Sequence, residues 1–542
     1  MEHHYTQIEC IHILLSSIFA SYKEINKKSQ TIFDLIKERK GDTIPVSKFM
    51  DIMDGSFECG TSKLEKRKTS EFVPSWINSN CIECNQCSFV CPHSVIRPFI
   101  LNEKEYNDSP EYIKEKCKKM LGKENMYFIL GISIKDCTGC GLCIKTCPSK
   151  EKALISKNID IELRNNVQEI YDYLDKNITY KPIFNKYTVK GSQFKQSKFC
   201  FPGACAGCGE TAYIKILTQL FGENLIIANA TGCSSIYGGS IPSIPYSLPW
   251  MNSLFEDNAE FGFGILNANN YIRTRIKNIM ENNLEGKNKE LFTEWLNNYD
   301  DYEITKKVYN LIDYNETKEL LELKDYIPSR TVFMIGGDGW AYDIGYSGID
   351  HVLASNQNVN ILVLDTEVYS NTGGQSSKSS RIGSIASFTS DGKKQNKKDL
   401  ARLALSYPNV YVAQISIGAN YNQILKVFKE ATSYNGPSII IAYSTCISHG
   451  IKGGMNNSLD MSKMAVECGF FPLFHYNPTE KKLYLDYKEP NFDLYEEFLN
   501  KQTRFSMLKT INKEKSEELL LKNKQNSIER FNYYKKLSEK TN

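Results

Sequence analysis

The sequence has no long hydrophobic run and no excess of charge of one sign. Its most apolar N-terminal stretch, residues 10–20, is about half a membrane span and follows no basic segment, which argues against a transmembrane helix and a secretory signal. Lys and Arg number 66 and Asp and Glu 63, so the net charge of +3 gives no field that attracts nucleic acid. With 41% hydrophobic and 24% charged residues, the composition excludes disorder and collagen. We expect a soluble cytoplasmic protein, with an organellar address left open.

Cysteine is the residue that the sequence has in unusual number and order. There are 17 cysteines in 542 residues, and nine of them lie between positions 81 and 147, eight in two tight groups of four. An odd count does not suit a fully paired disulfide framework, and clustered cysteines in a reducing compartment are more often metal ligands.

Both groups have the spacing C-x2-C-x2-C-x3-C-P, in CIECNQCSFVCP and CTGCGLCIKTCP. In this pattern three thiolates hold one 4Fe-4S cluster and the fourth ligates the other cluster. The spacing therefore predicts two clusters, and it disfavours a zinc ribbon or disulfides. The first would be held by Cys81, Cys84, Cys87 and Cys147, and the second by Cys91, Cys137, Cys140 and Cys143. We interpret His93 as a surface or neighbouring residue rather than a ligand.

The chain length predicts several domains. After a segment at residues 1–70 we expect a small α+β domain of the two-cluster ferredoxin kind at 71–160 and a linker at 161–198. Alternating helices and strands then predict an α/β domain with a doubly wound parallel sheet at 199–490, with an insertion near 260–324 and a helical tail at 491–542. The expected strands are 225–230, 331–335, 360–365, 411–416 and 438–443, and the expected helices are 211–220, 342–354 and 421–431.

Two strand ends carry a candidate phosphate and Mg²⁺ site. The strand expected at 331–335 runs into Gly337-Asp338-Gly339-Trp340, and the strand expected at 360–365 is followed by Thr366. Glycines let a backbone approach phosphate, and the following helix offers its N-terminus to the anion. An Asp, a Thr hydroxyl and a backbone carbonyl suit Mg²⁺. The alternative is an ordinary strand-to-helix turn with a capping Asp.

Four further cysteines lie near strand ends, namely Cys205, Cys208, Cys233 and Cys446. The carboxyl ends of parallel strands share one edge, so Cys233 and Cys446 should converge there with Asp338 and Thr366. Spacing does not distinguish zinc from iron here, but two neighbouring clusters favour a third redox centre. The remaining thiols, Cys10, Cys59, Cys117, Cys200 and Cys468, are interpreted as ordinary.

With these residues in view, the sequence resembles the C-terminal half of the pyruvate:ferredoxin (flavodoxin) oxidoreductases, in the thiamine-diphosphate-dependent 2-oxoacid:ferredoxin oxidoreductase family. The resemblance extends over about residues 41–485. It is carried by PVSKF, GTSKLEKR, CIECNQCSFVCPHSVIRP, CTGCGLCIKTCP, GACAGCGET, ATGCSSIYGGS, NSLFEDNAEFGFG, GGDGWAYDIGY, DTEVYSNTGGQSSK and YSTCISHGI.

The resemblance implies a set of site residues. Cys205, Cys208, Cys233 and Cys446 would hold a third 4Fe-4S cluster, and Mg²⁺ would bind Asp338, Thr366 and the carbonyl of Val368. Thiamine diphosphate would contact Glu210, Cys233, Gly337, Asp338, Gly339, Trp340, Thr366, Glu367, Val368, Tyr369, Ser370 and Asn371. The catalytic residues would be Asn371, which would face the substrate and donate to a developing oxyanion, and Glu210.

The implied activity is oxidative decarboxylation of pyruvate with coenzyme A to acetyl-CoA and CO₂, with electrons passed through three 4Fe-4S clusters to ferredoxin or flavodoxin. Single-chain members of the family are about twice as long, so we expect turnover to need the N-terminal family domains as a separate chain. The chain would be a split-enzyme subunit, a truncated form or a fragment, and we expect a homo-oligomer. The alternatives are an electron-transfer module with a non-catalytic thiamine site, and a subunit that acts on another 2-oxoacid.

Overall fold

The computed structural model describes residues 32–36, 38–53, 57–240 and 242–540. Of the segment expected at 1–70, residues 1–31, including Cys10, lie outside the described residues. The described part forms short 3-10 helices, η1 (Gly41–Thr43), η2 (Val46–Ile52) and η3 (Thr61–Leu64). Thr61 anchors this segment, because its Oγ1 donates to the Pro242 carbonyl at 2.5 Å and accepts from the Ile244 amide at 2.9 Å.

The small cysteine-rich domain contains two short sheets. Strand β1 (Phe72–Trp76) pairs antiparallel with β5 (Leu154–Asn158), and β2 (Ile96–Asn102) pairs with β4 (Met126–Ile132), which also pairs with β3 (Lys118–Lys119). Each cysteine run ends in a short helix, and the two helices pack together. These are α3 (Gln86–Val90) and α6 (Leu142–Thr146); α4 (Glu103–Asp108), α5 (Glu111–Lys114), η4 (Asn78–Asn80) and η5 (Ile134–Asp136) complete the domain.

The segment expected to be a linker, residues 161–198, is packed against this domain rather than extended. It carries most of α7 (Ile159–Arg164), with α8 (Val167–Asn177) and α9 (Val189–Ser192). Ile170 and Leu174 of α8 are buried with Phe99 and Ile129 of the β2–β4 pair. Their spacing of four places both on one face of the helix, which explains the packing.

The larger domain is built on an eight-stranded sheet in the order β13-β12-β10-β11-β9-β8-β6-β7. Six strands are parallel, and β12 and β13 add an antiparallel hairpin at one edge. The α/β class is confirmed, with a sheet that is mostly rather than wholly parallel. The strands are β6 (Leu225–Ala230), β7 (Trp250–Ser253), β8 (Thr331–Gly337), β9 (Asn360–Asp365), β10 (Tyr411–Ser416), β11 (Ser438–Tyr443), β12 (Phe474–Asn477) and β13 (Lys482–Leu485).

Helices cover both faces of this sheet, as its buried strands require. Along β6, Ile226 faces one apolar core and Ile227 the other. The first core packs against α12 (Asn258–Glu281), α16 (Tyr346–Ala354), α17 (Leu400–Ala404) and α19 (Ser458–Glu467). The second packs against α10 (Thr211–Phe221) and α18 (Tyr421–Ser433). Short helices follow two of the strands: α11 (Cys233–Gly239) follows β6, and the π-helical η8 (Gly339–Ile344) follows β8. The other short helical turns of this domain are η6 (Gly222–Asn224), η7 (Lys324–Tyr326), η9 (Ile447–His449), η10 (Met455–Asn457) and η11 (Phe492–Leu494).

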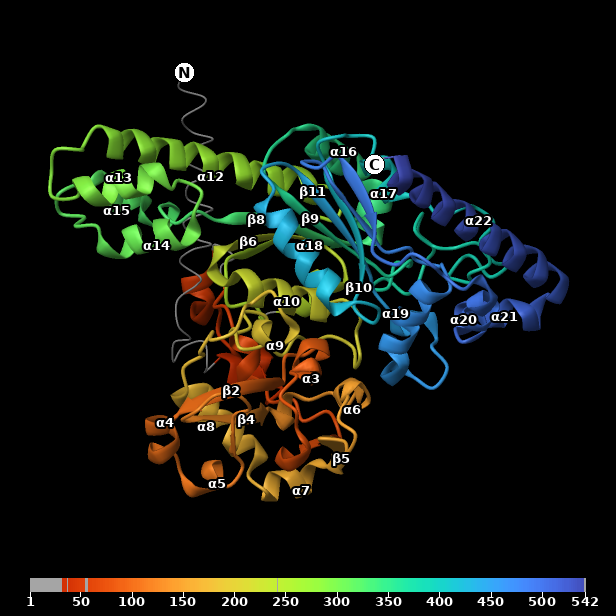
Figure 1. The fold of residues 1–542 in the computed structure, drawn as a ribbon, viewed down its shortest axis with the longest axis horizontal. Helices are drawn as coiled ribbons and strands as arrows, with labels where there is room; N and C mark the ends of the chain where they lie inside the picture. Colours follow the sequence, from red (N-terminus) through yellow and green to blue (C-terminus); the bar gives the residue numbers. More distant parts are fainter. Residues whose placement is uncertain (1–31, 37, 54–56, 241, 541–542) are drawn as a thin grey trace.

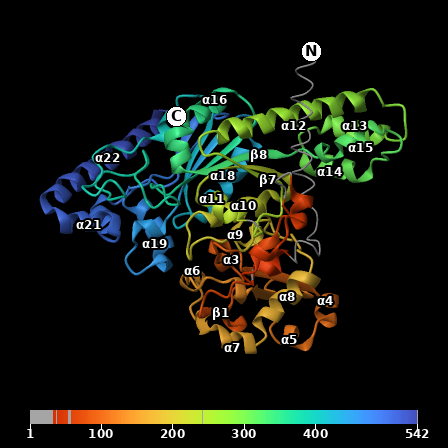
Figure 2. The ribbon, with the colours of Figure 1, turned by 180° about the vertical axis from the view of Figure 1, so that it is seen from behind.

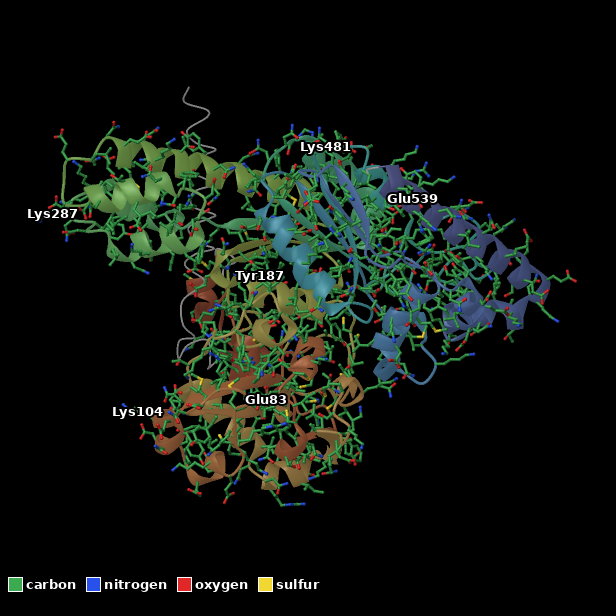
Figure 3. All side chains as sticks on the ribbon, in the orientation of Figure 1. Glu83, Lys104, Tyr187, Lys287, Lys481 and Glu539 are labelled. Carbon is green, nitrogen blue, oxygen red and sulfur yellow. The ribbon has the colours of Figure 1, made fainter. Side chains whose placement is uncertain are left out.

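Two helical parts extend from the sheet. The insertion consists of α12 with α13 (Lys289–Asn297), α14 (Tyr302–Leu311) and α15 (Glu319–Leu323), and it forms a lobe whose outer end is marked by Lys287 (Figure 1, Figure 3). The tail consists of α20 (Tyr495–Asn500), α21 (Thr503–Ile511) and α22 (Lys513–Lys540), on the opposite side from the lobe (Figure 2). Leu519 and Tyr534 of α22 are buried. None of the described helices combines the length and apolar character needed to cross a membrane.

Candidate functional site

A cavity of about 470 Å³ lies at the carboxyl ends of β6, β8 and β9. It is lined by Glu210, Thr231, Gly232, Cys233, Phe255, Gly337, Asp338, Gly339, Trp340, Thr366, Val368, Tyr369, Ser370, Asn371, Thr372 and Gln375. Eleven of the twelve residues implied to contact the cofactor are among these, and Glu367 is not. Gly339 leaves room for a neighbouring ring, because a Cβ there would lie 2.3 Å from Tyr369.

Three oxygen donors meet on one wall of the cavity. The Thr366 hydroxyl is 2.9 Å from Asp338 Oδ1 and 3.0 Å from the Val368 carbonyl oxygen. Asp338 is 1% exposed and also accepts a hydrogen bond from Ser377. Burial, together with the charge of Asp365, raises the pKa of Asp338 to about 7. A buried carboxyl beside a hydroxyl and a carbonyl oxygen is a donor set that fits Mg²⁺.

Glu367 points away from the cavity into a buried group of charges. Its backbone has φ +60°, and its carboxylate lies 2.9 Å from Arg381, 3.0 Å from Lys397 and 3.0 Å from Arg504. Although burial opposes ionisation, these three cations outweigh it and hold the pKa of Glu367 far below its ordinary value. The carboxylate thus anchors the loop that carries Thr366 and Val368, and its contacts are with protein cations.

Glu210 is a buried carboxyl on the cavity wall, at the start of α10. It is 5% exposed, and the Tyr237 hydroxyl donates to its Oε2 at 2.9 Å. Burial raises the pKa of Glu210 to about 7, against the opposing effect of that hydrogen bond. The side chain can therefore hold or release a proton near neutral pH.

The third cysteine group lies against the same cavity. Cys233 lines it, and the thiols of Cys205, Cys208 and Cys446 are all electrostatic neighbours of Cys233. The Cys446 thiol donates to the Ser370 hydroxyl at 3.3 Å, and that hydroxyl is 3.1 Å from Thr366 Oγ1. One serine on the cavity wall thus contacts both a cysteine of this group and the Asp338–Thr366 pair.

The two groups in the small domain also assemble across their runs. Cys87 has Cys81, Cys84 and Cys147 as electrostatic neighbours, which brings the distant Cys147 to the first run. A small cavity of about 50 Å³ is lined by all four cysteines of the second set, Cys91, Cys137, Cys140 and Cys143. Within the described residues, no set of three or more His, Cys, Asp or Glu side chains is arranged to hold a single metal ion. The assignment of ligands to each cluster stays a prediction.

The protonation of these thiols bears on what could bind them. Burial raises the pKa of Cys87, Cys143, Cys208 and Cys233, and it raises that of Cys137 to about 12 and of Cys140 to about 11. Cys147 is the exception: burial is opposed by hydrogen bonds from Ser149 and Ala153 and by Lys152, which together lower its pKa. Most of these thiols therefore need a bound cation to become thiolates, so the donor sets fit metal clusters.

The second and third groups touch through the loop of residues 204–208. The Gly207 backbone lies beside the Cys140 thiol and interacts with it electrostatically. His93 is buried beside it, with Nε2 3.1 Å from the Ala204 carbonyl and Nδ1 3.4 Å from the Thr138 hydroxyl. Burial lowers the pKa of His93 to about 4, so its ring is neutral. It is a neighbour of both groups and lies below the surface.

Five residues that line the cavity were not predicted from the sequence. Thr231 and Gly232 immediately precede Cys233 after β6, so their place at a strand end is a signal that the sequence contains. Gln375 returns to the cavity because its carbonyl accepts from the Tyr369 amide at 2.9 Å, a loop closure that no local pattern indicates. Thr372 belongs to the same loop, and Phe255 follows β7, a strand that the sequence analysis did not predict.

Fold and site define a thiamine diphosphate-binding α/β domain joined to a domain for two 4Fe-4S clusters. Residues 321–442 match the C-terminal TPP binding domain of thiamine pyrophosphate enzymes, and residues 80–151 match a 4Fe-4S dicluster domain. A domain of unknown function matches residues 28–70.

The chain is related to pyruvate:ferredoxin and pyruvate-flavodoxin oxidoreductases, as its motifs predict. It is 44% identical to pyruvate:ferredoxin oxidoreductase of Moorella thermoacetica, over 94% of this chain and 46% of the relative. It is 43% identical to pyruvate-flavodoxin oxidoreductase of Enterobacter agglomerans, over 93% and 45%. It is 42% identical to the mitochondrial pyruvate dehydrogenase [NADP(+)] of Euglena gracilis, over 93% and 29%. The chain thus spans about half the length, or less, of the curated relatives it matches.

Proposed function

We propose that this chain is the cofactor-bearing part of a pyruvate:ferredoxin or pyruvate:flavodoxin oxidoreductase. In the overall reaction pyruvate and coenzyme A give acetyl-CoA and CO₂, and two electrons pass singly to two oxidised acceptors. The names of the relatives support this substrate and these acceptors, and the presence on the cavity wall of eleven of the twelve residues implied by the family supports the cofactor.

The observation that carries the proposal is the position of Ser370. Its hydroxyl contacts both Thr366, a proposed Mg²⁺ ligand, and Cys446, a proposed cluster ligand. A site for carbon chemistry and an outlet for electrons therefore share one wall, which a two-electron oxidation with one-electron acceptors requires.

The residues have distinct proposed roles. Asp338, Thr366 and the Val368 carbonyl hold Mg²⁺, and the turn at 337–340 holds the diphosphate. When bound, thiamine diphosphate supplies the electron sink for decarboxylation of a 2-oxoacid. Asn371 is exposed on the cavity wall, where its amide can donate to the oxygen of the substrate carbonyl. Glu210 holds or releases a proton near neutral pH, because burial raises its pKa to about 7.

The three cysteine sets give electrons a route out of the cavity. They would hold the third cluster beside the cavity, the second next to it across the Gly207–Cys140 contact, and the first beside the second, because Cys87 is an electrostatic neighbour of Cys143. Ile82, beside Cys81, is 52% exposed and offers apolar surface for a small acceptor protein. Ferredoxin or flavodoxin would accept electrons there.

We propose further that the remaining half of the relatives' length is supplied by a separate chain, and that the assembly is a cytoplasmic homo-oligomer. The test is to mix the iron-loaded chain with N-terminal domains of a relative under anaerobic conditions, with methyl viologen as acceptor. Reduction that requires both pyruvate and coenzyme A supports the proposal. Asp338→Asn is the matched control, because it leaves all cysteines in place and should abolish the signal.

The same assay separates the alternatives. A chain that loads its clusters and thiamine diphosphate but stays silent with every 2-oxoacid is an electron-transfer module whose thiamine site is structural. Activity with 2-oxobutyrate or 2-oxoglutarate in preference to pyruvate assigns the chain to another 2-oxoacid.

A further inference from the structure

A buried lysine joins the two domains next to the first cysteine run, which carries Cys87 and Cys91. Lys215 lies on α10 of the large domain and is 1% exposed. Its ammonium group donates to the carbonyls of Ser88 and of Phe89, the latter at 2.7 Å. Both carbonyls belong to α3 of the small domain, between Cys87 and Cys91.

Lys215 has no acidic partner within the part of the chain that the structure describes. Its flanking residues on α10, Ile214 and Ile216, are fully buried, and among the described residues no carboxylate forms an ion pair with it. Arg97, a second buried cation nearby, differs because it pairs with Asp175 at 2.7 Å. A buried ammonium without a counter-charge is costly, so a lysine at this position needs an anion to face.

The electrostatic neighbours that favour the charged form are thiols. Burial lowers the pKa of Lys215 to about 8, while Cys91 and Cys87 are the first two groups that oppose this shift, followed by Cys200. Cys87 belongs to the first predicted cluster and Cys91 to the second, so one lysine lies close to ligands of both.

A cluster held by four thiolates carries a net negative charge, and reduction adds one more. A fixed positive charge nearby therefore stabilises the reduced form more than the oxidised form, and charge and hydrogen bonding are known to set cluster potentials. We propose that Lys215 is the counter-charge that raises the reduction potentials of both clusters in the small domain relative to the cluster at the cavity. The inference rests on the proposed function, because it needs those clusters to be present.

The consequence is a direction for electron flow. When bound, each cluster would take one electron and pass one on, with no bond made or broken. Raising the potentials of the two outer clusters makes transfer away from the cavity favourable. Lys215 would act on electron transfer only through the potentials of the clusters, because it does not contact the substrate.

The test is a redox titration followed by electron paramagnetic resonance, on the anaerobically loaded full chain. Lys215→Met and Lys215→Gln remove the charge, and the Gln variant keeps an N–H donor for the two carbonyls in case the Met variant loads poorly. Lys215→Arg keeps the charge. Lys186→Met is the matched control, because Lys186 is a half-buried lysine that donates to the Leu220 carbonyl of the same helix at 2.9 Å, with no thiol among its electrostatic neighbours.

We expect both neutral variants to lower the ratio of reduced to oxidised cluster at least about tenfold at fixed potential, a shift of roughly −59 mV for a one-electron couple. The cluster at the cavity should keep its potential, as should all clusters in Lys215→Arg and Lys186→Met. If the neutral variants have full iron and wild-type potentials, the proposed role of Lys215 is overturned and the proposed function is unaffected. A wild-type chain that takes up zinc or no iron would instead overturn the proposed function.

Discussion

Gly209 lies so close to the segment before Cys446 that no side chain fits there. A substitution at Gly209 is therefore a sensitive test of the third cysteine set. Gly209 follows Cys208, and its amide donates to the carbonyl of Thr445, the residue before Cys446, at 3.0 Å. A Cβ at Gly209 would lie 2.4 Å from the Thr445 nitrogen and 2.6 Å from its oxygen. Both are backbone atoms, so the clash cannot be relieved by rotating a side chain.

Gly209→Ala must therefore separate the two segments by about 1 Å to reach the ordinary contact distance of 3.4 Å. Overpacking of this kind costs about 1 to 3 kcal/mol, which a domain with two large apolar cores should survive. Metal–ligand distances tolerate only about ±0.2 Å. Cys208 and Cys446 should then fail to hold the same cluster, and iron should fall from about twelve atoms per chain to about eight.

The assay is iron quantification with electron paramagnetic resonance on anaerobically prepared protein. The signals of the two clusters in the small domain should persist, which separates a local defect from misfolding. Gly264→Ala is the control, because a Cβ there meets nothing within 4 Å on α12 and iron should stay at the wild-type value. A Gly209→Ala chain with all twelve iron atoms would refute the assignment of Cys208 and Cys446 to one cluster.

Three other substitutions test the remaining parts of the site. Asp338→Asn should weaken Mg²⁺-dependent binding of thiamine diphosphate by at least about 100-fold in calorimetry while iron content stays unchanged; simultaneous loss of iron would contradict separate sites. Glu367→Gln removes the anionic partner of the buried Arg381 and Arg504, while Lys397 keeps Asp365, and should destabilise the large domain by about 3 to 5 kcal/mol in thermal unfolding, whereas the exposed Glu518→Gln should change little. Cys143→Ala should remove one cluster, about four iron atoms, whereas Cys117→Ala, outside the three cysteine sets, should remove none.

Much of the sheet could be predicted because its strands carry a signal of their own. The ranges 225–230, 360–365, 411–416 and 438–443 are mostly apolar runs between turn residues, and the structure has strands with the same bounds. β7 and the β12–β13 hairpin were not predicted. β7 has only four residues, and its pairing with β6 is set by the partner strand rather than by its own composition.

The site shows the same division. The carboxyl ends of parallel strands lie at one edge of the sheet, independently of side-chain conformation. This alone predicts that four residues come together, namely Asp338, Thr366, Cys233 and Cys446. The direction of the Glu367 side chain does not follow, although it lies between two residues at the cavity. Its left-handed backbone turns it toward cations from three distant segments, and a sequence records none of those contacts in its local pattern.

Thiamine diphosphate binding and the proposed electron transfer therefore depend on different parts of the fold. The cofactor wall is fixed by strand order within the large domain, so changes there should alter occupancy first. The relation between the cavity and the small domain is fixed by docking, through Lys215 on the carbonyls of α3 and Gly207 on the Cys140 sulfur. Substitutions at that docking surface should change the potentials and rates of electron transfer while leaving thiamine diphosphate binding intact. Separate responses of this kind are expected only if the two domains are assembled as described.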